Sequence, residues 1–244
     1  MKKVILCLLV SFLTFDIAAQ GLDKSYKTLD LALAGGNGFS PALSYTKMFG
    51  IGKSNRFKLG YGVRFTSYFS NSTTDLRTAP AKLTSGSASF AALFAEDIVA
   101  NIDTFRLKSV QTNALNISIN LQYALSQKLE VGFNIDALGV TFGGKQIGDI
   151  VSVKNKRKFI DGSTQSTASP SGLNLLLVSD SDIGGLNSEL YGRYWVSDKI
   201  GIRAGVSFLF VEYMTDKNVK VNTDENNRWR YKSLLPMVAV SYKF

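Results

Sequence analysis

Apolar and polar residues alternate with a period of two along most of this chain, and this feature limits its fold more than any other. The clearest run covers residues 115–125, where every second residue is large and apolar: Leu115, Ile117, Ile119, Leu121, Tyr123 and Leu125. The residues between them are asparagine, serine, glutamine and alanine. A helix would scatter these two sets around its circumference, so the pattern indicates strands whose two faces meet different surroundings.

Eight segments carry the alternation, at residues 27–35, 39–49, 57–66, 115–125, 129–142, 185–197, 200–210 and 233–244. Short connections near residues 35–38, 50–55, 126–128 and 197–199 mostly alternate with long ones at 70–107, 143–184 and 214–228. Such asymmetry is typical of a β-meander that has short turns at one end and long, exposed loops at the other. We therefore expect an all-β fold, a single antiparallel up-and-down barrel of eight strands with long outer loops, with ten strands as the alternative.

The first residues have the pattern of an export signal. Lys2 and Lys3 precede an apolar run of 12 residues, and Ala18 and Ala19 follow it. We expect a signal peptide at 1–19 and the barrel domain at 20–244. The only cysteine, Cys7, lies inside this signal, so the mature chain would have no thiol. Removal of the signal would leave 26 basic and 18 acidic residues, a net charge of +8 that favours anionic neighbours.

No stretch approaches 18 consecutive apolar residues. A mature chain that spans a membrane must then do so as a closed barrel, because helices and barrels satisfy their own backbone groups in lipid. We expect the apolar face to meet lipid, since the polar face carries glycines and charges of both signs. These charges predict an interior polar network of Asp30, Lys58, Arg64, Glu130, Asp136, Glu189, Arg193 and Arg203. Basic residues facing lipid at mid-depth would instead cost about 2–4 kcal/mol each.

The end of the chain is an amphipathic strand that closes on an aromatic residue. Its alternate positions are Val238, Val240, Tyr242 and Phe244, and Pro236 interrupts the same face before them. With its strands and turns from about residue 27, the chain resembles small eight-stranded outer-membrane barrels of the OmpA- and OmpX-like type. The resemblance implies residence in the outer membrane, contact with its lipid, a monomer, and a terminal strand read as a signal by the barrel-assembly machinery.

Candidate chemistry is sparse. The chain has no histidine, the residue on which most general-base, triad and zinc sites depend. Glu130 and Asp136 could be catalytic, although a structural ion-pair network is the favoured interpretation. Asp180 and Asp182 lack the further ligands of a calcium loop. We expect no enzymatic activity, no cofactor and no metal.

One basic cluster lies in the loop 143–184: Lys154, Lys156, Arg157 and Lys158. It is a possible anion-binding loop for surface glycolipid or another polyanion, with a solvated loop as the alternative. No aromatic residues are interleaved with it, so nucleic-acid recognition is not expected.

The apolar segment 89–99 does not fit an outer loop. It could be a short helix over the barrel mouth, part of strands above the membrane together with residues 173–178, or an additional pair of strands that raises the number to ten.

For function we expect a closed, non-enzymatic barrel with a role in envelope structure or surface interaction through its outer loops. The alternatives are a narrow, porin-like pore or small-molecule transport barrel, a lipid-modifying enzyme, and a secreted soluble barrel that binds a lipid.

Overall fold

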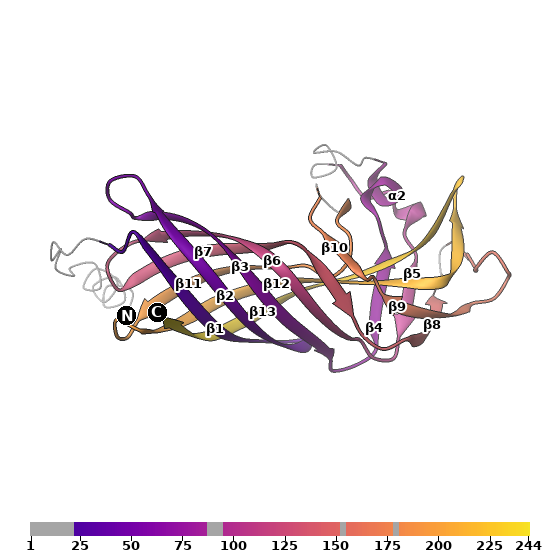
Figure 1. The fold of residues 1–244 in the computed structure, drawn as a ribbon. Helices are drawn as coiled ribbons and strands as arrows, with labels where there is room; N and C mark the ends of the chain where they lie inside the picture. The colour runs from indigo at the N-terminus through magenta and orange to yellow at the C-terminus, as the bar shows by residue number, and fades with distance from the viewer. Residues whose placement is uncertain (1–21, 87–94, 152–154, 178–180) are drawn as a thin grey trace, which may run out of the picture.

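The computed structural model describes residues 22–86, 95–151, 155–177 and 181–244 (Figure 1). Several predicted features lie outside these residues: the signal peptide, Lys154, Asp180 and residues 89–94 of the apolar segment. Of that segment the structure describes residues 95–99, in which Ile98 and Val99 are exposed and a 3-10 helix, Val99–Asn101, begins. No helix among the described residues is long and apolar enough to cross a membrane.

The described residues form thirteen strands and one α-helical turn, α2 (Ala81–Ser85). The strands are β1 (Ser25–Gly35), β2 (Gly38–Ile51), β3 (Phe57–Ser70), β4 (Thr74–Thr78), β5 (Thr104–Leu107), β6 (Gln111–Ala124), β7 (Leu129–Phe142), β8 (Gln146–Val151), β9 (Gln165–Pro170), β10 (Leu173–Leu175), β11 (Asn187–Trp195), β12 (Ile200–Val221) and β13 (Asp224–Lys243). This number exceeds the eight or ten strands expected from the sequence.

Antiparallel pairing joins the longer strands in a closed cycle, β1–β2–β3–β6–β7–β11–β12–β13 and back to β1. The closing pair runs from Thr28 opposite Lys243 to Ala34 opposite Met237. We call this cycle, up to about residue 210 of β12, the main barrel; it is the obliquely wound part of Figure 1. The prediction of an all-β antiparallel sheet closed on itself is confirmed.

The two faces of the main barrel differ sharply. Outward positions carry large apolar side chains that remain exposed, such as Leu31 at 64% and Leu234 at 63%. Inward positions carry polar or small residues. At Gly205 there is no room for any side chain, because a Cβ would collide with the backbone of β11 at Leu190 and Tyr191. The apolar face therefore points away from the barrel axis.

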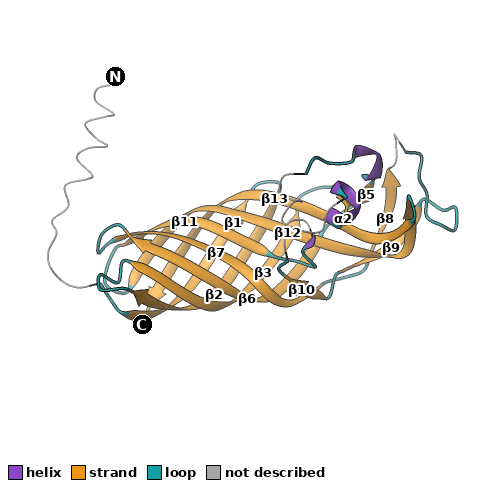
Figure 2. Ribbon diagram, turned by 90° about the horizontal axis from the view of Figure 1, so that it is seen from above, coloured by secondary structure: helices purple, strands orange, loops and turns teal. Residues whose placement is uncertain are grey.

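A second closed cycle lies beyond one end of the main barrel. The outer parts of β12 and β13 pair with β9 and β4, and β4–β5, β5–β8 and β8–β9 complete the ring. We call this ring, with residues 211–231 of β12 and β13, the distal lobe; it forms the right-hand end of Figure 1. The helical turns also lie at this end (Figure 2).

The distal lobe corrects the expectation of long outer loops. Segments 70–107, 143–184 and 214–228 contain β4, β5, β8, β9, β10 and the ends of β12 and β13. These strands form because they enclose an apolar core, in which the Trp229 ring lies 5.4 Å from Phe105 and the Phe105 ring 6.3 Å from Phe159. The other core members, each at most 7% exposed, are Leu76, Leu107, Ile150, Ala168, Val211, Tyr213, Val219 and Val221.

The side chains therefore reverse their arrangement between the two parts. In the main barrel apolar residues point outward and polar residues inward. In the lobe the apolar core residues point inward and Asp75, Arg106 and Asp149 are exposed, as is the apolar residue Ile147. On β12 the inward residues change from Arg203 and Ser207 to Val211 and Tyr213, and Glu212 between the last two is buried as well. The kind of side chain that the sheet encloses therefore changes near residue 210.

Candidate functional site: the ion-pair network of the barrel lumen

Five strands bring charged side chains into the lumen. Asp30 lies on β1, two basic residues on β3, two acidic residues on β7, and the remaining three on β11 and β12. Each occupies an inward position of the period-two pattern, so strand geometry alone aims it at the barrel axis. All eight residues of the predicted network lie there, each at most 3% exposed: Asp30, Lys58, Arg64, Glu130, Asp136, Glu189, Arg193 and Arg203.

Ion pairs join these eight residues into one continuous chain of alternating sign. At the distal end Arg64 lies 2.6 Å from Asp136 and 3.2 Å from Glu189. Arg203 continues the chain, 2.6 Å from Glu189 and 3.4 Å from Asp30.

Arg193 is the central residue in the half of the ion-pair series that lies away from the distal lobe. Its guanidinium lies 3.0 Å from Asp30 and 3.4 Å from Glu130, and Glu130 lies 3.6 Å from the Lys58 ammonium. Four acidic and four basic groups thus cancel, and the network is neutral along its length.

Neutral polar side chains satisfy much of the remaining hydrogen-bonding capacity. Asn134 accepts a bond from Arg64 at 2.7 Å and donates one to Glu189 at 2.7 Å. Near the proximal end Tyr26 donates to Gln122 and Glu130. The Tyr191 ring lies 3.7 Å from the Arg203 guanidinium carbon. Buried charges remain in a protein when they are paired and hydrogen-bonded in this way, because an unpaired one is costly.

The two acidic residues considered for catalysis, Glu130 and Asp136, both form ion pairs within the network. Asp136 accepts bonds from Arg64, from the Asn116 amide at 2.8 Å and from the Asn187 backbone N–H at 3.0 Å. Glu130 is held between Lys58 and Arg193. The arrangement joins the surrounding strands and keeps both carboxylates in ion pairs.

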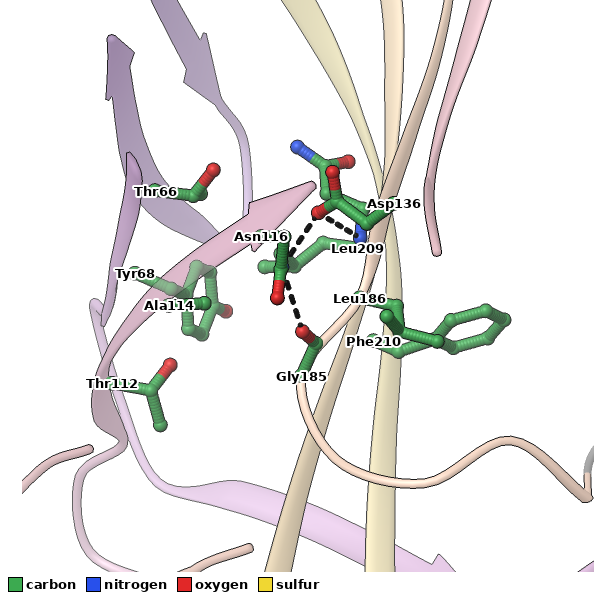
Figure 3. Close-up of a pocket in the computed structure, with 11 residues that line it drawn as sticks. Thr66, Tyr68, Thr112, Ala114, Asn116, Asp136, Gly185, Leu186, Leu209 and Phe210 are labelled. Atoms are coloured by element: carbon green, nitrogen blue, oxygen red, sulfur yellow. Dashed lines mark hydrogen bonds between the residues drawn. The ribbon is translucent and has the colours of Figure 1, made fainter. Parts of the chain in front are cut away.

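Figure 3 shows a cavity at the distal edge of this network. Polar residues, among them Asn116 and Asp136, line it together with Tyr68, Leu186 and Leu209. Its volume is about 10 Å³, roughly the space that one water molecule requires. A cavity of this size does not accommodate a solute.

A second charged cluster, which the sequence did not predict, joins the barrel to the lobe. Glu212 on β12 accepts bonds from Arg228 and Arg230 at 2.9 Å, from Ser171 at 2.9 Å and from the Gly184 N–H. Both arginines also donate to the Asp182 backbone oxygen. The only sequence signal was opposite charge at paired positions of a hairpin, and that hairpin was expected to be a loop.

The predicted anion-binding cluster is divided. Lys156 and Lys158 are exposed, whereas Arg157 lies 2.9 Å from Asp103. Asp182, considered above as a weak calcium candidate, accepts the Leu177 N–H at 2.6 Å. Among the described residues no group of three or more histidine, cysteine or acidic side chains is placed to hold a metal ion.

No family model matches the sequence, and no curated protein matches it. Among solved structures the chain is similar to Neisserial surface protein A at 16% identity and a TM-score of 0.39, over 92% of this chain and 100% of that one. A major outer membrane protein from Thermus thermophilus is 11% identical with a TM-score of 0.38, over 91% and 100%. The Yersinia pestis outer membrane protein Ail is 8% identical with a TM-score of 0.35, over 90% and 99%. With TM-scores below 0.5, no property of these proteins is carried over to this chain.

Proposed function

We propose that this chain is an integral outer-membrane β-barrel that is closed to solutes and displays a folded lobe at the cell surface. The reversal of faces near residue 210 carries the proposal. Below that level large apolar side chains stay exposed around a ring whose interior is charged, which suits hydrocarbon outside and protein inside. Above it the apolar side chains are enclosed and polar ones exposed, which suits water.

The length of the apolar belt supports the same proposal. On β3 it extends from Phe57 to Phe65 on alternate outward positions, with Phe69 beyond. A strand that crosses a bilayer needs about 9–11 residues. Aromatic side chains gather at the short-turn end, where Tyr242 stacks on Phe244 at 6.2 Å; such girdles are expected at membrane interfaces.

We further propose that the barrel has no enzymatic activity and serves envelope structure or surface interaction through the distal lobe. The eight charged side chains are buried in the lumen, and their carboxylates are held in ion pairs. The terminal strand, with Val238, Val240, Tyr242 and Phe244 on its outward face, would be read by the assembly machinery. This strand is paired on both sides, with β1 and β12.

The membrane location and orientation can be tested by cysteine labelling, because the one native cysteine lies in the predicted signal. Thr164→Cys in the lobe and Ser197→Cys in a short turn each introduce one exposed thiol. We expect a membrane-impermeant maleimide to label Thr164→Cys in intact cells and Ser197→Cys only after the outer membrane is permeabilised. Equal labelling of both in intact cells, or release of the protein without detergent, would refute the proposal.

Conductance in planar bilayers tests whether the lumen is closed. The refolded mature chain should give no steady conductance steps under conditions in which an open porin, inserted as the positive control, does. Folded protein is verified by its altered electrophoretic mobility before heating. Steady steps from the wild-type chain would favour the alternative, a narrow pore or small-molecule transport barrel.

A further inference from the structure

Two lysines face each other on the outside of the barrel. Lys27 on β1 and Lys47 on β2 are direct partners across the antiparallel pair. Both occupy outward positions: Lys27 is exposed two residues before the belt residue Leu29, and Lys47 is partly exposed two residues before Phe49. The pair therefore lies near the short-turn edge of the apolar belt, with Phe49 and Ile51 on the short-turn side of Lys47.

Aromatic rings surround this pair. The Lys27 ammonium lies 6.0 Å from the Phe244 ring centre, and the Lys47 ammonium lies 5.0 Å from that of Phe49. Tyr45 and Tyr61 extend the group, since Tyr45 lies 6.1 Å from Phe244 and Tyr61 lies 6.1 Å from Phe49. The arrangement is a shallow apolar rim around two positive charges.

The two positive charges are not neutralised within the described part of the chain. Neither Lys27 nor Lys47 forms an ion pair there, although Lys243 nearby lies 3.0 Å from Asp23. Like charges directly opposite each other on a sheet are destabilising. An anion bound between the two ammonium groups would convert this repulsion into attraction.

The end of the barrel that carries the short turns has a positive net charge as a whole. Its basic residues are Lys24, Lys27, Lys47, Lys53, Arg56, Lys128, Lys199 and Lys243, and its acidic residues are Asp23 and Asp198. Eight basic and two acidic residues leave a charge of +6, most of the +8 of the predicted mature chain. The lumen network adds nothing to this charge, because its four acids and four bases cancel.

We propose that Lys27 and Lys47 bind the phosphate of an anionic phospholipid in the leaflet around the short-turn end. This inference rests on the proposed membrane location. The lysines supply the charge for the phosphate, and the belt residues beside them supply apolar surface for the acyl chains. A water-soluble polyanion would gain the charge contact alone, so the position at the edge of the belt favours a lipid.

The test uses the refolded mature chain in phosphatidylcholine vesicles that contain trace spin-labelled lipid. Electron spin resonance then measures the association of spin-labelled phosphatidylglycerol relative to spin-labelled phosphatidylcholine. At low salt we expect the wild-type chain to prefer phosphatidylglycerol by about fivefold or more, and we expect the double variant Lys27→Gln and Lys47→Gln to lose most of this preference. The matched control, Lys82→Gln and Lys220→Gln, changes the same charge at exposed lobe positions and should retain it.

Three results would overturn the inference: no preference in the wild type, a preference that survives in the Lys27/Lys47 variant, or an equal loss in the lobe control. Displacement of the spin-labelled lipid by lipid A more readily than by phosphatidylglycerol would also overturn it, by assigning the pair to a glycolipid. Flotation with the vesicles separates the two proposals. A chain that does not float refutes the membrane location itself, whereas one that floats without preference refutes only the lipid site.

Discussion

Each arginine of the lumen network pairs with two acidic residues, and this governs the effect of a single substitution. Arg64 contacts Asp136 and Glu189, and it also donates to Asn134 and to the Asn187 backbone oxygen. A pair at the surface of the lobe is different. Arg106 lies 2.6 Å from Asp75, whose pKa it lowers through hydrogen bonds, but both side chains are about half exposed. Water can replace a lost partner in the lobe and cannot do so in the lumen.

Arg64→Met is expected to lower the free energy of unfolding by about 3–5 kcal/mol, because it leaves Asp136 and Glu189 buried with less positive charge. Guanidinium titrations in phospholipid vesicles, followed by tryptophan fluorescence, measure this change. Arg106→Met, the control, should leave the free energy of unfolding nearly unchanged, because this pair is exposed to water.

A second variant separates lost charge balance from lost packing. Adding Asp136→Asn to Arg64→Met removes one of the uncompensated carboxylates, so part of the lost stability should return. If Arg64→Met cost no more than Arg106→Met, the lumen network would not be the stabilising element described above.

At the scale of the element, β12 and β13 are the two strands that run through both the barrel and the lobe. Both alternate with a period of two along the barrel, but in the lobe the alternation is interrupted: Val211, Glu212 and Tyr213 are all buried on β12, as are Trp229 and Arg230 on β13. The kind of residue on the outward face also changes. Outward residues of β13 include Leu234, Val238 and Val240 along the barrel. On the lobe side, Lys220 of β12 is exposed. The side chains exposed on one strand therefore differ between its two halves.

Two aliphatic residues with nearly equal exposure test that difference. Val238, midway along the belt on β13, is 59% exposed, and Ile147, on the outside of β8 in the lobe, is 60% exposed. Val238→Arg should lower the free energy of unfolding in vesicles by about 2–4 kcal/mol, because it places a charge in hydrocarbon. Ile147→Arg should change it by about 0.5 kcal/mol or less, because it faces water. Equal effects of the two substitutions would argue that no lipid surrounds the belt.

At the scale of the whole molecule, two cores are stacked along one axis. The barrel has an ionic interior and the lobe an apolar one, and the cluster around Glu212 lies where they join. The two tryptophans of the chain are divided between them. Trp195 is 5% exposed in the barrel and packs edge-on against Tyr26 at 6.2 Å, while Trp229 is fully buried in the lobe core.

Variants with one tryptophan should reveal separate unfolding of the two parts. In urea, we expect Trp229 emission in Trp195→Phe to shift at a lower concentration than Trp195 emission in Trp229→Phe. In the proposed membrane location the lobe would unfold into water, whereas unpaired barrel strands would expose backbone groups to hydrocarbon at a cost of several kcal/mol each. Coincident transitions in the two variants would mean that the shared strands β12 and β13 make the molecule one cooperative unit.

Local pattern was sufficient to predict much of this molecule from its sequence. Because the side-chain period of a strand is two, Asn116 and Ile117 must point to opposite faces wherever that strand lies. The same argument placed Arg64 and Asp136 on the polar face with the other charged residues. It could not say which charges meet, because Arg64 and Asp136 are 72 positions apart and come together only when β3, β6 and β7 lie side by side.

The tertiary structure alone decided the distal lobe and the identity of the ion pairs. Strands such as β5, with four residues, contain too few alternations to stand out from a loop, and they form because β4 and β8 pair with them around Trp229 and Phe105. Alternation also leaves open which face is enclosed. Alternating strands enclose an ionic interior below residue 210 and an apolar one above it. The alternation describes only the order of side chains along a strand, whereas the closure of the sheet determines which of them are buried.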